Sequence, residues 1–364
     1  MKVKNVIMYW ISGVSHWYST KSLRKIVVNN HHDALKLADF ADVDDFRKQG
    51  FSISDSYVYD LKHQDYRRYI TTWESYQPRC KSKMKKYFPI SDDKYLFFLV
   101  FSHFIKTPNC YALINNGKVI WLSDKYHGCD VYDFLLQNKG GVIKDRGGSD
   151  GFEVYVFSTD SYCKQLFYRE KLVSKEDLQH ILLKSKNCIL QERVEQGDFA
   201  NAIYSKSINT LRVITINNGK GKNEVVGAVL RVGTRRSSPV DNFCQGGGSC
   251  LVDIETGEIG CMTTLFSKND KNHFVYYDKH PESETILKGE IIPRWKEIKN
   301  TLLELMEKLP FFEYVAWDIA LQNDGITVLE TNMKSSMNVF QIHSAMRDTL
   351  LGEKYREHGW LVDE

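Results

Sequence analysis

The sequence predicts an α+β fold of antiparallel sheets, preceded by a mainly helical N-terminal region. Three observations support this prediction. Strand-like runs occur in pairs joined by short polar turns, as at residues 207–216 and 226–233. A stretch that opens at Pro293 repeats apolar residues at the spacing of an amphipathic helix. Residues 1–88 have helical composition and no repeated strand–helix–strand pattern, so we expect this region to be mainly helical.

Within the N-terminal region, residues 22–37 and 44–49 have helical composition. Residues 65–86 carry aromatic side chains at helical spacing, namely Tyr66, Tyr69, Trp73 and Tyr76. Such a stripe more often forms core than a stacking surface for sugar rings. The basic run at 81–86 is typical of a solvated helix face, although it could also touch an acidic glycan or a membrane surface.

Composition argues against a nucleic-acid-binding protein. The chain of 364 residues can hold one large core and a smaller domain. Its hydrophobic fraction of 42% and charged fraction of 26% are ordinary for a globular protein. A formal net charge of +3 is too small to indicate binding of nucleic acid.

Cysteine usage and hydropathy predict a cytoplasmic protein that is not transmembrane. The cysteines include no CxxC pair and no His at metal-ligand spacing, so we expect free thiols in a reducing compartment. The apolar run near the N-terminus lacks a small-residue cleavage site and is followed at once by His16 and Trp17, which argues against a signal peptide. No apolar stretch reaches the ~18 residues that cross a bilayer.

The segment YVAWDIALQNDGITVLETN predicts a β-hairpin with an acidic residue on each strand. Residues 323–325 supply the turn, and a three-residue loop that ends in Gly places Gln322 opposite Ile326. Counting outward from that pair, Asp318 faces Glu330. Both carboxylates then point to the same side of the sheet.

These two acids and a nearby amide predict a magnesium site. Asn332 lies two residues beyond Glu330 and therefore on the same face as Asp318. Carboxylate and amide oxygens that converge on one point suit a hard cation such as Mg²⁺. A two-residue loop at 324–325 would instead pair Ile319 with Glu330 and separate the two acids. The simpler alternative is that both acids lie on the solvent face of the hairpin.

Two lysines accompany features that suit phosphate binding. Lys94 opens an apolar run that is typical of a buried helix, and Lys144 ends a predicted strand. The glycine-rich turn that follows Lys144 contains Gly147, Gly148, Ser149 and Gly151. Backbone N–H groups in such a turn can approach phosphates closely. It is not a Walker loop, because no GK[ST] sequence opens a helix, and by itself it is also typical of an ordinary hairpin turn.

Three more segments suit a nucleotide and an anionic substrate. Residues 188–198 form a strand with a polar exit, which either presents backbone groups to an adenine edge or simply ends the strand. Arg212 and Arg231 each lie among apolar residues of a predicted strand and need an anion, either a ligand or a structural carboxylate. Residues 238–249 contain three consecutive glycines beside Asn242. We interpret this run as flexible backbone that can approach a ligand closely, which favours anion or substrate binding over a plain loop.

Together these segments resemble the ATP-grasp superfamily, and within it the sugar-transfer-associated ATP-grasp family of bacterial surface-polysaccharide loci. The resemblance covers about residues 90–348. It is carried by the Lys94 and Lys144 segments, the QERV hinge, the SINTLRVIT strand, the SPVDNFCQGGGS loop, the HP and IPRW sequences and the WDIA…LETN hairpin. It implies an ATP-grasp fold, in which two α+β lobes close on ATP and Mg²⁺.

The resemblance also implies a role for individual residues. Those implied to bind ATP are Lys94, Lys144, Gly147, Gly148, Ser149, Gly151, Gln191, Glu192, Val194 and Asp198, with Glu195 as the alternative to Asp198 at the ribose. Those implied to hold magnesium, as two ions for which Mn²⁺ can substitute, are Asp318, Glu330 and Asn332. Those implied at the reacting end are Arg231, Arg212 and Asn242. The chain departs from the family pattern at Asp145, where Pro is common, and in the shorter acid at the ribose position.

The activity that the resemblance implies is an ATP-dependent carboxylate–amine ligase. A carboxylate would attack the γ-phosphate of ATP, and an amine would then displace phosphate from the acyl-phosphate. The implied acid is a uronic acid of a nucleotide sugar or glycan, and the implied amine is an amino acid or amino alcohol, with peripheral association to polysaccharide assembly machinery. The alternatives are a sugar kinase and a non-catalytic nucleotide-binding module. His280 is either a local base or, more simply, a structural histidine.

We expect two parts along the chain. Residues 1–88 would form the helical N-terminal region, and residues 89–364 the ATP-grasp domain. Within that domain we expect a nucleotide lid at about 141–193 and a metal- and substrate-binding lobe at about 194–364.

Overall fold

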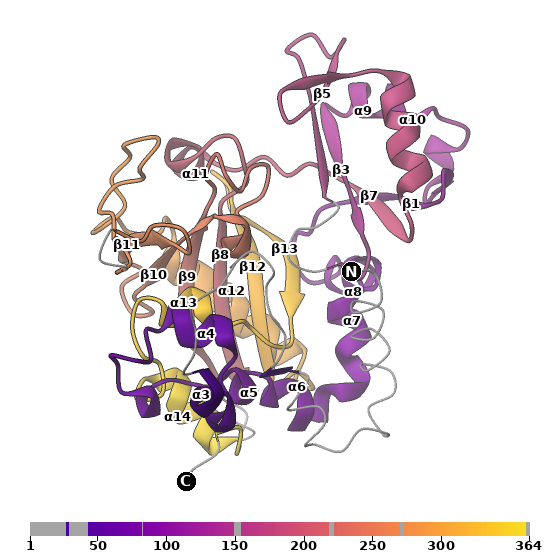
Figure 1. Ribbon diagram of the computed structural model, residues 1–364. Coiled ribbons are helices and arrows are strands. Elements are labelled where there is room, and N and C mark those ends of the chain that lie inside the picture. The colour runs from indigo at the N-terminus through magenta and orange to yellow at the C-terminus, as the bar shows by residue number, and fades with distance from the viewer. Residues whose placement is uncertain are drawn as a thin grey trace. The chain divides into compact units, whose positions relative to one another are not determined.

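The computed structural model describes residues 27–28, 43–81, 83–148, 154–217, 222–269 and 273–361. Contacts divide the chain into two units, which are drawn in Figure 1. The helical unit comprises Met1–Gln77 and Ser336–Glu364, and the sheet unit comprises Pro78–Ser335. The expected boundary between residues 88 and 89 stays a prediction.

The helical unit is built from short helices, which confirms the helical character expected of the N-terminal region. They are α3 (Val43–Gln49), α4 (Ile53–Val58), η1 (Tyr66–Arg68), α5 (Thr72–Ser75), α13 (Asn338–Gln341) and α14 (Leu350–Glu357). Tyr69 and Trp73 are buried, so this part of the aromatic stripe is core. Thr71 and Glu74 form a capping box at the start of α5, and Arg347 donates to Glu74 at 2.8 Å. Most of the helical segment expected at 22–37 lies outside the described residues.

In the sheet unit, an antiparallel seven-stranded sheet has the order β2-β1-β7-β3-β4-β5-β6. Its strands are β1 (Cys110–Asn115), β2 (Lys118–Trp121), β3 (Gly140–Asp145), β4 (Tyr155–Thr159), β5 (Leu166–Tyr168), β6 (Lys171–Val173) and β7 (Cys188–Gln191). Helices α9 (Val131–Gln137) and α10 (Lys175–Lys184) cover one face, where Ile143 and Leu190 are buried with Phe134 and Leu178. Because side chains alternate, Lys144 and Gln191 lie on the opposite face.

An antiparallel six-stranded sheet in the same unit has the order β11-β10-β9-β8-β12-β13. Its strands are β8 (Thr210–Asn217), β9 (Asn223–Val232), β10 (Gly248–Val252), β11 (Ile259–Thr264), β12 (Tyr314–Leu321) and β13 (Ile326–Asn332). Helix α12 (Trp295–Lys308) packs against β8 and β9, as Figure 1 shows. Its buried residues are Trp295, Ile298, Leu302, Leu305 and Met306. The amphipathic helix expected after Pro293 is thus confirmed, and it leaves the other face of the sheet for polar side chains.

Short helices connect these elements. They are α6 (Gln77–Lys81), η2 (Lys83–Tyr87), α7 (Phe88–Asp92), α8 (Lys94–Phe101), η3 (Asp124–Tyr126), α11 (Asp198–Ile203) and η4 (Phe243–Gln245). Asp93 caps α8 by accepting from the N–H groups of Tyr95 and Leu96. Ser91 in α7 donates to the carbonyl of Thr331 in β13 at 2.7 Å, which fixes the start of α8 beside the acidic hairpin. Among the described residues, no helix is both long and apolar enough to cross a membrane.

Candidate functional site

The acidic hairpin has the expected acid pair but not the expected turn. Asp318 pairs with Glu330 across β12 and β13, as the sequence predicted. The pairing of Gln322 with Ile326 is wrong, because Leu321 pairs with Ile326 instead. From that pair a regular ladder would place Leu329 opposite Asp318. A β-bulge at the step from Ile319 to Asp318 adds one residue on β13, and this restores the pairing of Asp318 with Glu330.

Tertiary hydrogen bonds explain the wider turn. Gln322 donates from its side chain to the carbonyl of Glu195 at 2.9 Å and accepts from Lys106 at 2.8 Å. The side-chain oxygen of Asn323 accepts from the backbone N–H of Asp198 at 2.8 Å. These partners are more than a hundred residues away along the chain, so local turn rules could not include them.

A row of ionic side chains crosses the six-stranded sheet on the face opposite α12. Arg212 binds Asp318 in a bidentate pair, with Nε–Oδ1 at 2.7 Å and Nη2–Oδ2 at 2.6 Å. Arg231 bridges two carboxylates, at 3.2 Å from Asp318 Oδ2 and 2.7 Å from Asp241 Oδ1. The remaining oxygen of Asp241 accepts from the backbone and hydroxyl of Thr210. The two arginines that the sequence placed on separate strands therefore share one carboxylate.

The electrostatics favour the charged forms of Asp318 and Arg212. Burial raises the pKa of Asp318, but the Arg212 and Arg231 guanidiniums outweigh it and hold that pKa below its ordinary value. Burial opposes the charge on Arg212, and the Asp318 carboxylate more than offsets this, so the pKa of Arg212 lies above its usual range. Burial raises the pKa of Asp241, which the neighbouring Arg231 offsets only in part.

The residues at this position can accommodate magnesium. Glu330 has a partly exposed carboxylate whose ion-pair partner is the Lys94 ammonium at 3.9 Å. Asn332 has a buried side-chain nitrogen that bonds to no described residue. Asp318 accepts one hydrogen bond at Oδ1 and two at Oδ2 from the arginines. A carboxylate has about four lone-pair positions, so one position on Oδ1 can still bind a cation. No group of three or more His, Cys, Asp or Glu occurs in the described parts of the chain, so the candidate set is two carboxylates and one amide.

The face of the seven-stranded sheet that is opposite α9 and α10 carries polar groups that bond to no described residue. Gln191 is only 1% exposed, and neither its side-chain oxygen nor its nitrogen bonds to a described residue. Burial lowers the pKa of Lys144 to about 8, with the Lys94 charge acting in the same direction and Glu330 opposing it. Val142 pairs with Gln191 and Lys144 with Ile189, so this face combines apolar side chains, one amide and one cation. Such a surface suits a base and its phosphates.

Lys94 lies where the glycine-rich turn meets the acidic hairpin. Its ammonium donates to the carbonyl of Gly148 at 2.5 Å, and its backbone N–H donates to the carbonyl of Arg146. Arg146 in turn binds Asp93 through two bonds, at 3.3 and 2.5 Å. Gly147 donates its N–H to the Asp145 carboxylate at 2.7 Å. The candidate residues Ser149 and Gly151 lie outside the described residues.

The hinge residues have more protein contacts than the sequence suggested. Glu192 accepts from the backbone and side chain of Asn109 and donates its N–H to the Asn109 carbonyl at 2.8 Å. Val194, two residues further on, is half-buried. Asp198 and Glu195 are both exposed. Asp198 accepts from the side chain of Asn323 at 3.1 Å, and Glu195 lies 3.8 Å from Arg193. The choice between the two acids for ribose stays open.

The loop at 234–248 is held by the protein rather than free. Asn242 caps η4 by accepting from Gln245 at 3.2 Å, so its side chain already has a structural partner. The glycines meet protein atoms closely: a Cβ on Gly247 would lie 2.3 Å from the carbonyl oxygen of Asp241, and one on Gly248 would lie 2.2 Å from Met262. The interpretation of this run as flexible backbone is wrong, because each glycine is needed for close packing.

His280 is a structural residue. Its Nε2 lies 2.9 Å from the carbonyl of Gly233, and its Nδ1 accepts from the backbone N–H groups of Glu282 and Ser283. It is fully buried and stacks on Tyr204. Both ring nitrogens are therefore used, and the role of local base that the sequence left open is not supported.

Sequence reasoning missed two residues, Asp241 and Asp93. Asp241 is buried and positions Arg231, and Asp93 both caps α8 and pairs with Arg146. Asp93 carried a recognisable signal, since it directly precedes an apolar helix. Asp241 did not, because it lies in the loop after β9 and only the fold of that loop brings it to Arg231.

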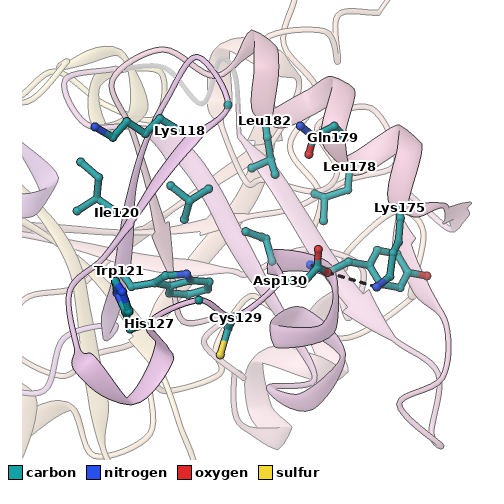
Figure 2. A pocket seen from close by; sticks show the side chains of 15 residues that line it. Lys118, Ile120, Trp121, His127, Cys129, Asp130, Lys175, Leu178, Gln179 and Leu182 are labelled. Carbon is teal, nitrogen blue, oxygen red and sulfur yellow. Dashed lines mark hydrogen bonds and ion pairs between the residues drawn. The ribbon is translucent and has the colours of Figure 1, made fainter.

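A cavity of about 640 Å³ lies in the sheet unit, away from the ionic row (Figure 2). Its lining comes from β2, α10 and the start of α9, and includes Trp121, Asp130 and Lys175. Lys175 is already paired with Asp130 and Asp133, at 3.5 and 2.9 Å. This cavity is on the helix-covered side of the seven-stranded sheet, opposite the face of Lys144 and Gln191, and is separate from the ionic row.

The described arrangement can be compared with known proteins. Solved structures that it resembles include an ADP complex of N5-carboxyaminoimidazole ribonucleotide synthetase (10% identity, TM-score 0.40, covering 73% of this chain and 53% of that one). Another is D-alanine–D-alanine ligase from Helicobacter pylori (13% identity, TM-score 0.41, covering 75% of this chain and 62% of that one). A third is D-cycloserine synthetase (11% identity, TM-score 0.39, covering 76% of this chain and 73% of that one). The chain thus spans little more than half of the first of these. The comparison with curated proteins finds no match.

The family comparison is more specific. The model of the family described as sugar-transfer-associated ATP-grasp matches residues 74–352, which is more than half of the chain. The matched region contains both sheets, the ionic row and the face of Lys144 and Gln191. This match confirms the resemblance and the ATP-grasp fold expected from the sequence. The chain belongs to the sugar-transfer-associated ATP-grasp family.

Proposed function

We propose that the chain is an ATP-dependent carboxylate–amine ligase that works through an acyl-phosphate. The observation that carries this proposal is the pairing of two surfaces. The six-stranded sheet presents the ionic row of Arg212, Arg231, Asp318 and Asp241 beside Glu330. The seven-stranded sheet presents Lys144 and Gln191, whose side chains bond to no described residue. Family membership makes ATP the natural occupant between them.

The proposed chemistry needs charge neutralisation more than acid–base catalysis. The substrate carboxylate attacks the γ-phosphorus of ATP. The bond between that phosphorus and the bridging oxygen of ADP breaks, and an acyl-phosphate forms. The amine then attacks the acyl carbon, inorganic phosphate leaves, and the amine proton passes to solvent. Magnesium, when bound by Asp318, Glu330 and Asn332, neutralises phosphate charge. Lys144 and Lys94 would bind phosphate oxygens, and Arg231 would face the developing acyl-phosphate.

Two parts of this proposal go beyond the family match. The acid is proposed to be a uronic acid of a nucleotide sugar or glycan, and the amine an amino acid or amino alcohol. This part of the proposal is supported by the position of Arg231, which lies at the end of the sheet from which the 234–248 loop leaves. We also propose two metal ions, with Mn²⁺ able to replace Mg²⁺, because the resemblance to the ATP-grasp family implies them.

The test is ADP release from purified protein with ATP and Mg²⁺, across a panel of uronic acids and amines. We expect ADP only when both an acid and an amine are present, together with an amide product by mass spectrometry. Phosphorylated sugar without amide would establish the kinase alternative instead. ATP binding without turnover across the panel would favour the non-catalytic module. Glu330→Gln serves as the control for ADP released by a contaminant.

A further inference from the structure

An exposed arginine beyond the ionic row is held in place without an anionic partner. The Arg236 guanidinium lies 3.7 Å above the centre of the Phe266 ring. Within the described part of the chain, no ion pair or hydrogen bond engages this guanidinium. Stacking uses the π face of the guanidinium, so its N–H donors, which lie in the plane of the group, remain available.

The surrounding backbone is shaped to fit this side chain. Gly246 has a φ of 105°, and a Cβ there would lie 2.4 Å from Cδ of Arg236 and 2.7 Å from its Cγ. Only glycine therefore allows the arginine stem to cross the loop at this point. Thr234 fixes the loop by donating to the carbonyl of Gly246 at 2.9 Å, and its N–H donates to Ser237 at 3.0 Å.

Phe266 is equally well positioned. Its backbone N–H donates to the Thr264 hydroxyl at 3.1 Å. Ser267 closes the same turn by donating to the Thr264 carbonyl at 2.9 Å, and the N–H of Val275 donates to the Ser267 carbonyl at 2.7 Å. The ring beneath Arg236 is thus supported by backbone hydrogen bonds, which limits the side-chain freedom lost when a ligand binds.

Register places this pair at the reacting end of the sheet. Ser249 pairs with Arg231, and the preceding residue, Gly248, pairs with both Val232 and Thr264. Arg236 therefore follows the strand of Arg231 by a few residues, and Phe266 follows Thr264 by two. Both leave the sheet from the end at which Arg231 lies.

We propose that Arg236, stacked on Phe266, binds an oxyanion of the sugar substrate, either a carboxylate or a phosphate. This inference rests on the proposed function, because it assigns the substrate end of the same site. A planar guanidinium with its edge free matches the two oxygens of a carboxylate or phosphate. Arg212 and Arg231 cannot do this as freely, since both are already paired with buried carboxylates.

The test measures binding of three probes in the absence of ATP: glucuronate, glucose 1-phosphate and glucose. We expect the full-length protein to bind at least one of the charged probes more tightly than glucose. Arg236→Gln should weaken that binding roughly tenfold or more, as expected for loss of a charge-assisted pair, and Arg236→Lys should restore it only in part. Which charged probe responds distinguishes a carboxylate from a phosphate.

The matched control is Arg235→Gln, which removes the same charge from the neighbouring exposed residue. Its backbone N–H, which is unchanged, donates to Glu282 at 2.9 Å. It should leave binding of all three probes unchanged. Equal probe affinities in wild type and Arg236→Gln would overturn the proposal, as would equal binding of glucose and both anions. Binding of an ATP analogue is measured separately, so failure of the nucleotide site is distinguished from failure of the Arg236 site.

Discussion

The two sheets of the sheet unit differ in whether their functional side chains are paired with other side chains. On the six-stranded sheet, Arg212, Arg231, Asp318 and Asp241 neutralise one another. On the seven-stranded sheet, the amide of Gln191 is buried without a described partner. A paired row leaves no buried charge uncompensated, whereas an unpaired buried amide costs stability. The comparison teaches that the first surface is pre-organised, whereas the second retains an amide that the proposed nucleotide could satisfy.

The largest effect is expected where the paired row is broken at its centre. Asp318→Asn leaves the Arg212 and Arg231 guanidiniums buried without full compensation. Loss of one partner from a buried ion pair typically costs about 3–5 kcal/mol, so the free energy of unfolding should fall by that order. Urea denaturation measures this change. A decrease of less than about 1 kcal/mol would mean that water reaches the row.

The matched substitution on the other acid should separate stability from activity. Glu330 is a third exposed in its side chain, so Glu330→Gln should change unfolding by less than about 1 kcal/mol. Turnover should nevertheless fall by about 10³-fold, the equivalent of several kcal/mol in the barrier, because a metal ligand charge is lost. ADP release at limiting Mg²⁺ is the measurement. Wild-type turnover in this variant would show that Glu330 is not a metal ligand.

The two arginines should differ in which kinetic constant they change. Arg231 contacts two carboxylates and lies nearer the 234–248 loop, so we expect Arg231→Lys to lower kcat by ~10²-fold, the scale of one lost oxyanion donor. Arg212→Lys should act mainly by raising KM. Lysine keeps the charge and limits the structural damage. The opposite pattern, with kcat lowered only by Arg212→Lys, would reverse the two assignments.

A smaller effect is expected from pH on the seven-stranded sheet. The pKa of Lys144 is lowered by burial to about 8, so its charge is lost as pH rises through that value. Affinity for ATP should therefore fall above about pH 8, approaching tenfold per pH unit. The same lowered pKa makes folding stability increase between about pH 8 and the ordinary lysine value of 10.5, because the unfolded state then holds more protons.

Lys144→Arg provides the control for that pH dependence, since arginine stays protonated throughout the range. Isothermal titration of an ATP analogue at several pH values should show a flat affinity in this variant above pH 8. If the variant keeps the pH dependence of the wild type, the titrating group is elsewhere.

The smallest effects are expected at Gln191, where a substitution should raise stability and lower the affinity for nucleotide. Gln191→Leu removes an amide that is buried without a described partner, so the free energy of unfolding should rise by about 1 kcal/mol. Affinity for an ATP analogue should fall severalfold, because the amide no longer meets the base. Thermal melting with and without the analogue measures both quantities. Lower stability with unchanged affinity would mean that Gln191 is a packing residue.

Much of the site could be predicted because its signals are local. Alternation along β12 and β13 placed Asp318, Glu330 and Asn332 on one face, and this depends only on strand periodicity. The predicted pair was nevertheless correct for an incomplete reason, since a wider turn and a bulge cancel each other. Local turn rules could not include the bonds of Gln322 and Asn323 to residues near α11.

By itself, the sequence determined the fold class, the family and the strand faces, because these follow from periodicity and from motifs read along the chain. The tertiary structure decided which charges meet. Arg212 meets Asp318 and Lys94 meets Gly148 only after strands and helices distant in sequence have packed together. The glycine run was likewise read as flexible until packing showed its open sides filled by Arg236, Asp241 and Met262. Pairing and close packing are properties of neighbours in space, and one chain read in order does not contain them.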